Sequence, residues 1–313
     1  MNALLFPGQG SQVVGMGSEF YQKYEKVKKI FKEADETLNY SISKLILEGP
    51  ADELQLTMNT QPAILTVSYS IFKVFEDEFG LDLNSFKYFA GHSLGEYSAL
   101  VCANSLTFKD SLYLLHERGK SMQEAVPVGQ GSMIAVLGMK TPEIKSLLNS
   151  KKEKNGVCEI ANDNADGQVI ISGDKESVES FKILLKEKKI KSIPLNVSAP
   201  FHCSLMKPAA KKMEEKIHST KFLNPSHKII NNVTAKSEDN SETIKKLLVD
   251  QIFSTVKWRE SIIEMSETGV KNFIEIGPGK VLTGMVKRTI KDVNCFSINS
   301  IADIKNFTDE FKK

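Results

Sequence analysis

The sequence predicts an α/β fold in which a large hydrolase-like domain, built on a mostly parallel sheet, contains an inserted ferredoxin-like subdomain. Short apolar strands alternate with amphipathic helical patterns along most of the 313 residues, which is typical of a helix-covered parallel sheet. Between residues 129 and 197 the pattern changes to β-α-β-β-α-β, the order of a ferredoxin-like unit. Strand and helix signals then resume, so we expect a large discontinuous domain over 1–128 and 198–313 around a small subdomain over 129–197.

Glycine, proline and capping residues mark the elements in the first part of the chain. Pro7-Gly8 ends the first apolar strand, Gln61-Pro62 is placed as at a helix start, and Thr107 with Asp110 resembles a capping box. The predicted elements are a strand over 3–6, helices over 19–38 and from 61 to 80, a strand over 88–90, and helices from 96 and from 107.

Periodicity predicts the remaining elements in the same way. Those of the subdomain are strands over 133–137, 157–161, 169–172 and 190–195, helices from 141 and over 176–188, and a polar turn over 162–167. Those that follow are helices over 205–217, within 243–267 and over 281–290, and strands over 228–231, 273–276 and 295–298.

Composition excludes several classes of protein. The 41 Lys and Arg nearly balance the 39 Asp and Glu, and a net charge of +2 gives no general attraction to nucleic acid or membranes. The four cysteines lie far apart, unlike the paired ligands of a structural zinc site, and no apolar run approaches the roughly 20 residues that span a bilayer. Because the N-terminus has no secretory signal pattern, we expect the protein in the cytoplasm, or in an organelle matrix after removal of a transit peptide. We also expect it to be a monomer.

Gly91-His92-Ser93-Leu94-Gly95 fits the G-x-S-x-G pattern and lies between a predicted strand and a predicted helix. A nucleophile elbow requires this context, because a tight turn exposes the serine and small flanking residues let backbone segments approach closely. A glycine-rich turn that only packs well is the alternative. Ser93 is the candidate nucleophile, and it needs a base within hydrogen-bond distance.

Five histidines are candidates for that base. His202 is favoured because it follows the loop over 198–201, and functional side chains concentrate on such loops. His92 adjoins Ser93, and we expect it to support the turn. The other candidates lie on predicted helices or a strand: His116, His218 and His227. Cys203 follows His202 in an extended segment and should point to the opposite face, as a buried thiol.

Arg118 leaves its predicted helix within an apolar sector, near Leu114 and Met122 on the helical wheel. A permanent charge there either snorkels to water, pairs within the structure or binds an anionic ligand. The functional interpretation is a fork that binds a substrate carboxylate through two parallel hydrogen bonds. The residues alone leave the structural and functional interpretations open.

Two other glycine loops and three groups of lysines indicate a particular function less specifically. The loop over 8–11 lacks both the P-loop ending and the dinucleotide spacing, although its N–H groups suit an anion, and the loop over 275–280 is typical of a structural turn. Lysines over 151–152, 186–191 and 207–216 are typical of solvated faces, or of a surface that docks an acidic partner.

Motifs in a fixed order over nearly the whole chain resemble the malonyl-CoA:acyl carrier protein transacylase family. The matching segments are FPGQGSQ (6–12), TQPA (60–63), GHSLGEYSAL (91–100), GQGSM (129–133), GQVIISG (167–173), NVSAPFH (196–202) and IGPGKVL (276–282). Together they are far more specific than the elbow alone. One departure is Asp166, at a turn position where relatives often have proline.

The resemblance implies that Ser93 is the acylated nucleophile and that His202 is its general base and acid, oriented by the backbone carbonyl of Gln251. It also implies an oxyanion hole made by the backbone N–H groups of Gln9 and Leu94. Four further residues would line the substrate pocket, and Arg118 would pair there with the malonyl carboxylate. The four are Gln61, Met122, Asn162 and Phe201.

The implied reaction moves malonyl from malonyl-CoA to the phosphopantetheine thiol of an acidic acyl carrier protein that docks on a basic surface, with no cofactor and no metal. The pathway would be fatty-acid synthesis or, alternatively, polyketide synthesis. Two other classes remain open. One is a serine esterase or thioester hydrolase that uses water as acceptor, and the other is a non-catalytic scaffold that binds a carrier protein.

Overall fold

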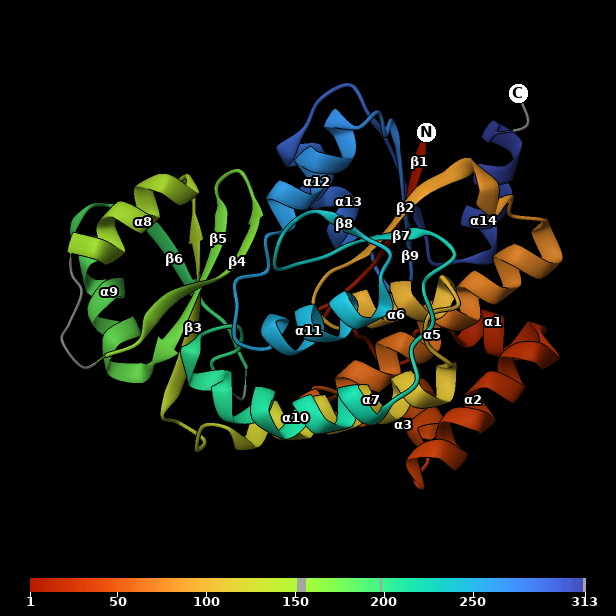
Figure 1. Ribbon diagram of the computed structural model, residues 1–313, viewed down its shortest axis with the longest axis horizontal. Helices are drawn as coiled ribbons and strands as arrows, with labels where there is room; N and C mark the ends of the chain where they lie inside the picture. The colour runs from red at the N-terminus through yellow and green to blue at the C-terminus, as the bar shows by residue number, and fades with distance from the viewer. Residues whose placement is uncertain (151–155, 198, 312–313) are drawn as a thin grey trace.

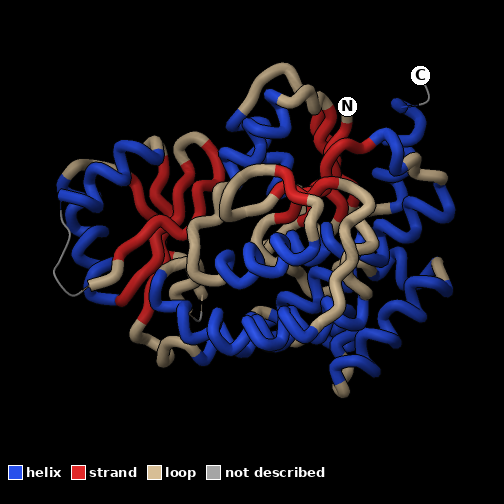
Figure 2. The backbone as a smooth tube through the Cα atoms, viewed as in Figure 1, coloured by secondary structure: helices blue, strands red, loops and turns tan. Residues whose placement is uncertain are grey.

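Two β-sheets organise the computed structural model, which describes residues 1–150, 156–197 and 199–311 (Figure 1). The lysines predicted at 151–152 and the boundary residue 198 lie outside the described residues. Figure 2 shows the two sheets as separate groups of strands with helices around and between them. The predicted domain boundaries at 128/129 and 197/198 stay predictions.

The larger sheet has the strand order β10-β9-β1-β2-β7-β8, and its first five strands are parallel. Only β8 pairs antiparallel, with β7, which confirms the mostly parallel sheet. The strands are β1 (Asn2–Phe6), β2 (Phe86–Gly91), β7 (Lys228–Ile230), β8 (Ser237–Glu238), β9 (Asn272–Ile276) and β10 (Asn294–Ile298).

β1 lies at the centre of this sheet, between β9 and β2, and is buried along its whole length. Alternate side chains of a strand point to opposite faces. Ala3 and Leu5 accordingly join the core that contains Trp258, whereas Leu4 and Phe6 join the larger core on the other face. A short run of apolar residues thus anchors both helical layers.

The smaller sheet is antiparallel and has the order β4-β5-β3-β6. The chain passes through it as β3 (Gly131–Leu137), α8 (Thr141–Ser150), β4 (Cys158–Ala165), β5 (Gln168–Asp174), α9 (Lys175–Glu187) and β6 (Lys191–Pro194). This order confirms the ferredoxin-like unit. In Figure 1 the helices α8 and α9 cover the side of this sheet that faces away from the larger sheet.

The helices around the larger sheet include three that periodicity did not predict: α3, α4 and α14. The full set is α1 (Ser18–Lys23), α2 (Glu25–Leu38), α3 (Ile42–Glu48), α4 (Ala51–Leu54), α5 (Thr57–Phe79), α6 (Gly95–Cys102), α7 (Phe108–Glu124), α10 (Lys207–Ser219), α11 (Ser241–Gln251), α12 (Trp258–Glu267), α13 (Val281–Thr289) and α14 (Ile301–Phe311). Two 3₁₀ turns, Leu83–Ser85 and Ser204–Met206, precede β2 and α10.

Two helix predictions need correction. The helix predicted over 19–38 is wrong as one element, because Tyr24 is extended (φ −115°, ψ 117°) and separates α1 from α2. The helix predicted to start at Gln61-Pro62 starts at Thr57, so Pro62 lies inside α5. In contrast, Thr107 caps α7 as predicted, and its hydroxyl oxygen accepts the Asp110 N–H at 3.0 Å.

Pro62 has no N–H to donate to the carbonyl of Met58, one turn earlier in α5. His116 of α7 replaces that donor, with 3.2 Å between its Nδ1 and the Met58 oxygen. The ring of His116 also packs on Tyr40, at 5.8 Å between centroids. His116 therefore holds α7 against α5, and this contact brings Gly119 close to the Met58 backbone.

β4 joins the small sheet to the larger part of the protein. The polar turn predicted over 162–167 is wrong at its start, because β4 continues to Ala165 and Asn162 forms a parallel bridge with Val256. The Asp163 N–H donates to the Val256 oxygen at 3.0 Å, and the Asp163 carboxylate accepts three hydrogen bonds from Arg259, the shortest of 3.0 Å. These contacts fix Asn162 at the junction between the sheets.

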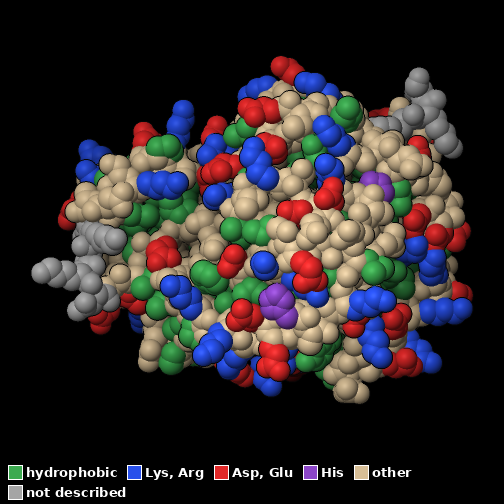
Figure 3. All heavy atoms as spheres, in the orientation of Figure 1, with side chains coloured by type: hydrophobic (Ala, Val, Ile, Leu, Met, Phe, Trp, Pro, Cys, Tyr) green, Lys and Arg blue, Asp and Glu red, His purple; other side chains and the backbone are tan. Residues whose placement is uncertain are grey.

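Basic and acidic side chains are interspersed over the face drawn in Figure 3, as the near-zero net charge leads one to expect. Among the described residues no helix is long and apolar enough to cross a membrane. In the same residues there is no cluster of three or more side chains suited to hold a metal ion.

Candidate active site

Ser93 lies on a tight turn at the carboxyl end of β2, directly before α6. Its φ of 53° is in the left-handed region, which a non-glycine residue adopts only when its surroundings impose it. A Cβ on Gly91 would lie 1.9 Å from the Gly95 backbone, and one on Gly95 would lie 2.2 Å from the Phe6 oxygen. Both glycines of the motif are therefore required by close backbone contacts, as expected for an elbow.

His202 meets Ser93 at the edge of the sheet, with 2.8 Å between Nε2 and the serine Oγ. Its Nδ1 lies 2.8 Å from the backbone oxygen of Gln251, at the end of α11. Because a carbonyl only accepts, Nδ1 carries the hydrogen and Nε2 is left to accept from the Ser93 hydroxyl. Cys203 is buried, as predicted, and its thiol donates to the Pro200 oxygen.

The imidazole of His202 is neutral in this environment. Burial lowers its pKa to about 3, and the nearby positive charge of Arg118 acts in the same direction. The side chain is only 5% exposed. A buried, neutral imidazole bonded to a hydroxyl is ready to accept its proton when the hydroxyl attacks.

Arg118 projects from α7 into the same site and is only 1% exposed. Its Nη1 donates to the Gln61 Oε1 at 2.8 Å, while Nη2 donates to the Gln251 Oε1 at 2.9 Å and to the Ser93 Oγ at 3.1 Å. Its Nε is buried and has no hydrogen-bond partner among the described residues. The guanidinium therefore does not snorkel to water, and all three of its bonds are to neutral groups.

A cavity of about 240 Å³ opens in front of Ser93, between the ends of the larger sheet and the small sheet. It brings together Ser93, His202 and Arg118 with the four pocket residues expected from the resemblance, Gln61, Met122, Asn162 and Phe201. Further lining comes from the start of α13 and from β3 and β5, through Val281, Leu282, Met285, Met133 and Ile170. The lining combines apolar side chains with polar groups that converge on Ser93, as is usual for a ligand pocket.

Gln9 and Leu94, each with a backbone N–H, both line this cavity. Neither N–H donates a hydrogen bond to another group within the described ranges. The loop that carries Gln9 packs on the elbow, because a Cβ on Gly8 would lie 2.6 Å from the His92 oxygen. Two unpaired donors next to the serine suit the oxyanion of an acyl-transfer intermediate.

The remaining histidines serve the structure. The His92 ring bonds to the Asn164 Oδ1 at 2.8 Å and packs edge-on against Trp258, which supports the turn as predicted. His227 stacks on Phe89, with 4.5 Å between ring centroids, and His218 ends α10. Among the described residues, none of these three side chains hydrogen-bonds to the Ser93 hydroxyl.

Sequence reasoning missed the polar groups behind the elbow. Glu96, Asn231 and Asn232 are completely or almost completely buried, and they hydrogen-bond to one another, to Gln251 and to the Ser93 backbone. The signals were present: a carboxylate directly after the G-x-S-x-G pattern, and paired asparagines at the carboxyl end of a predicted strand. Polar residues at the ends of parallel strands are common in the sites of such sheets.

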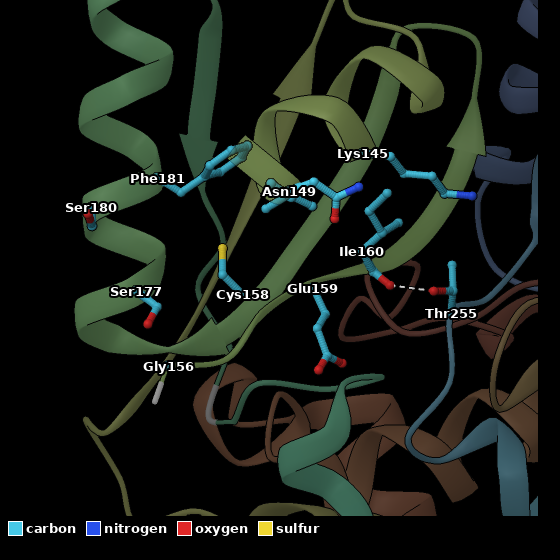
Figure 4. A pocket seen from close by; sticks show the side chains of 11 residues that line it. Lys145, Asn149, Gly156, Cys158, Glu159, Ile160, Ser177, Ser180, Phe181 and Thr255 are labelled. Carbon is cyan, nitrogen blue, oxygen red and sulfur yellow. Dashed lines mark hydrogen bonds between the residues drawn. The ribbon is translucent and has the colours of Figure 1, made fainter. Parts of the chain in front are cut away.

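A larger cavity of about 460 Å³ lies in the small sheet, away from Ser93 (Figure 4). Its polar groups include Glu159, whose carboxylate accepts from the Ser204 N–H and hydroxyl, and Thr255, whose hydroxyl donates to the Ile160 oxygen. The bonds from Glu159 hold Ser204, two residues after His202. The smaller cavity holds the nucleophile and the base, so it is the candidate active site.

A serine hydroxyl bonded to a neutral imidazole, on a strand-to-helix turn of a parallel sheet, is the arrangement of α/β enzymes that work through a serine nucleophile. The chain belongs to the family described as the acyl transferase domain, whose model matches residues 3–312. The protein is accordingly an acyltransferase.

Known relatives share both its sequence and its fold. The chain is 45% identical, over 298 residues, to the malonyl CoA-acyl carrier protein transacylase of Bacillus subtilis, an alignment that covers 95% of this chain and 93% of that protein. It is 39% identical to the acyl-carrier-protein-S-malonyltransferase of Bartonella henselae, whose crystal structure superposes with a TM-score of 0.96 and coverage of 100% and 99%. A malonyl-transacylase in complex with a type II polyketide acyl carrier protein matches with a TM-score of 0.94, 39% identity and 99% coverage of each chain.

Proposed function

We propose that this protein transfers the malonyl group of malonyl-CoA to the phosphopantetheine thiol of an acyl carrier protein, through a malonyl ester on Ser93. The observation that carries the proposal is the Arg118 guanidinium, buried in the cavity 3.1 Å from the Ser93 Oγ. A buried cation next to the nucleophile recognises an acyl group that ends in a carboxylate. The names of the relatives support the same substrates.

In the first half of the reaction, the Ser93 Oγ attacks the thioester carbon and passes its proton to Nε2 of His202. The backbone N–H groups of Gln9 and Leu94 hold the oxyanion of the tetrahedral intermediate. The carbon–sulfur bond then breaks, and His202 gives the proton to the CoA sulfur. The Gln251 carbonyl stabilises the protonated imidazole through Nδ1.

In the second half, the carrier thiol gives its proton to His202, and its sulfur attacks the serine ester. The serine oxygen leaves and takes the proton back, so that both halves use the same groups. Arg118 binds the malonyl carboxylate, and Gln61, Met122, Asn162 and Phe201 shape the pocket around it. Every step uses side chains, backbone N–H groups and the two thiols, so the proposed reaction includes no cofactor.

The partner in this proposal is an acidic carrier protein that docks on lysine-rich surface near the cavity. We also propose that the enzyme is a monomer and that it acts in the cytoplasm. The first candidate pathway in this proposal is fatty-acid synthesis. The relative that was solved with a type II polyketide carrier keeps polyketide synthesis as the second candidate.

Intact-protein mass spectrometry after mixing with malonyl-CoA tests the proposal. We expect an adduct of malonyl mass that is absent from Ser93→Ala and disappears when holo carrier protein is added. Release of CoA that depends on Ser93 but leaves no adduct would favour a thioester hydrolase. Absence of both the adduct and CoA release would favour a non-catalytic scaffold.

A further inference from the structure

Glu96 is a buried carboxylate directly behind the nucleophile elbow. It is the second residue of α6 and has no solvent exposure. Its Oε1 accepts from Nδ2 of Asn231 at 2.6 Å, and its Oε2 accepts from the Asn232 N–H at 3.1 Å and from Nε2 of Gln251 at 2.8 Å. All three donors are neutral, and a charge buried among neutral groups points to a role beyond packing.

The donors from Asn231 and Asn232 are fixed in place. The Asn232 donor is a backbone N–H and cannot turn. The amide of Asn231 cannot exchange its nitrogen and oxygen, because its Oδ1 accepts the backbone N–H groups of Val233 and Thr234, at 2.8 and 3.2 Å. Both oxygens of Glu96 therefore face hydrogens, and the ionised carboxylate, which only accepts, suits this arrangement best.

The third donor, Gln251, lies between a negative and a positive group. Its Nε2 faces the Glu96 carboxylate, and its Oε1 accepts from Nη2 of Arg118 at 2.9 Å. Exchange of its nitrogen and oxygen would turn an acceptor toward the carboxylate and donors toward the guanidinium. The two charges thus fix one orientation of this amide, although neither charge touches the other.

The residues that Glu96 holds are those that hold the reacting groups. Gln251 donates from Nε2 to the Ser93 oxygen at 3.1 Å, and its backbone oxygen accepts from His202. The Asn232 Oδ1 accepts the Ser93 N–H at 2.7 Å, and its Nδ2 donates to the Gly91 oxygen at 2.8 Å. Each reacting group is thus connected to Glu96 through a single intervening residue.

We propose that Glu96 is a positioning residue of the active site: through Gln251 and Asn232, its carboxylate fixes the orientation of Arg118, the Ser93 elbow and His202. The inference rests on the proposed function, because it assigns Glu96 a part in that same reaction. It goes further by identifying a residue that contacts no substrate.

The test uses Glu96→Gln, which has the same shape but presents an amide NH₂ at one end. In either orientation of the new amide, that NH₂ meets a fixed donor. We expect labelling of Ser93 by a fluorophosphonate probe at about pH 8 to slow by about 10- to 100-fold, the range for losing a hydrogen bond to a charged group. The probe carries no malonyl group, so the readout stays informative even if wild-type protein forms no malonyl adduct and the proposed function fails.

Asp174→Asn is the matched control. Like Glu96, Asp174 is a carboxylate that accepts hydrogen bonds at both oxygens, here from the backbone N–H groups of Val157 and Ser177, but it lies at the start of α9, outside the active-site cavity. We expect Asp174→Asn to be labelled at the wild-type rate even if its unfolding temperature falls as far as that of Glu96→Gln. Equal slowing in both variants, or wild-type labelling of Glu96→Gln, would overturn the proposal.

Glu96→Asp keeps the charge but shortens the side chain, and it serves if Glu96→Gln does not fold. We expect folded Glu96→Asp to be labelled more slowly than wild type, and faster than Glu96→Gln where both fold. Malonylation of Glu96→Asp by malonyl-CoA should fall at least as much as its labelling, because malonyl transfer depends on Arg118 as well. Wild-type rates of both reactions would overturn the proposal.

Discussion

The guanidinium of Arg118 is bonded directly to the hydroxyl of Ser93, with 3.1 Å between Nη2 and Oγ. The second hydrogen of Nη2 is directed to Gln251, so both are engaged. A substrate carboxylate that binds to Nη2 takes the place of the serine and leaves its hydroxyl to His202 alone. In the proposed reaction, binding of the carboxylate and release of the Ser93 hydroxyl therefore depend on the same atom, Nη2 of Arg118.

This link predicts how Arg118→Ala affects different acyl groups. We expect acylation by malonyl-CoA to fall by about 100-fold or more, because charge-assisted hydrogen bonds to the carboxylate are lost. Acylation by acetyl-CoA should fall much less. The measurement is the initial burst of CoA release from each thioester. Arg118→Lys, which keeps the charge without the fork, should lie between, and equal losses for both substrates would contradict the carboxylate role.

Glu96 predicts the acid limb of the pH profile. Burial raises its pKa to about 7, against the hydrogen bonds from Asn232, Gln251 and Asn231 and the positive charge of Arg118. Below that pH one oxygen carries a proton and the set of three acceptor contacts is incomplete. Because His202 stays neutral down to about pH 3, the fluorophosphonate labelling rate of wild-type protein should fall through about pH 7.

Protonation of Glu96 has opposite effects on labelling and on folding: it should slow the labelling of Ser93 but stabilise the folded protein. The folded pKa of Glu96 lies above the unfolded value of 4.5, so this stabilisation is fully present below about pH 4.5 and is lost as the pH rises through about 7. Loss of labelling near pH 6 should therefore occur in protein that is still folded by circular dichroism. In Glu96→Gln the limb near pH 7 should disappear. If the labelling rate of Glu96→Gln still falls near pH 7, a group other than Glu96 causes that fall.

Gly95 and Gly284 are both helical, but only Gly95 is crowded. A Cβ on Gly95 would lie 2.2 Å from the Phe6 oxygen, whereas a Cβ on Gly284 in α13 meets nothing within 4 Å. We expect Gly95→Ala to lower the free energy of unfolding by about 2 to 3 kcal/mol and to slow Ser93 labelling. Gly284→Ala should raise it by up to about 1 kcal/mol and leave labelling unchanged. Urea denaturation measures both, and equal effects would contradict the close contact at the elbow.

The Asp163–Arg259 pair predicts a stability effect at the junction of the sheets. The Asp163 side chain is 2% exposed and that of Arg259 21% exposed. Arg259→Ala leaves a buried carboxylate without its partner and should cost about 3 kcal/mol of unfolding free energy. The double variant Asp163→Ala/Arg259→Ala should cost less, because no unpaired charge remains. A double variant that loses as much as the two single variants together would show that the pair is not coupled.

Many of the helices, strands and turns can be predicted from the sequence, because local sequence patterns determine them. Strand-to-helix turns such as the one at Ser93 carry their own glycine signal, and the β-α-β-β-α-β order predicts the small sheet before any contact is known. The errors came where tertiary contacts override local preference. Pro62 is accommodated within α5 because His116, 54 positions along the chain, replaces the lost donor.

Some residues of the active site can likewise be predicted from the sequence, and others cannot. Ser93 and His202 belong to recognisable motifs, whereas the roles of Glu96 and Asn232 become clear only from their contacts in the folded structure. Periodicity places a glutamate in the first turn of a helix, where such residues are usually exposed. Its burial depends on β7 lying beside β2, a neighbourhood between segments more than 130 residues apart that the sequence pattern does not specify.

The central place of β1 has a consequence during synthesis. β1 pairs with β2 on one side and with β9 on the other, and β9 is synthesised more than 260 residues after β1. Until then the nascent chain exposes one edge of an apolar strand, which is a template for association with other chains. Completion of the larger sheet is therefore a late, long-range event, and a C-terminal truncation that removes β9 should yield aggregated protein.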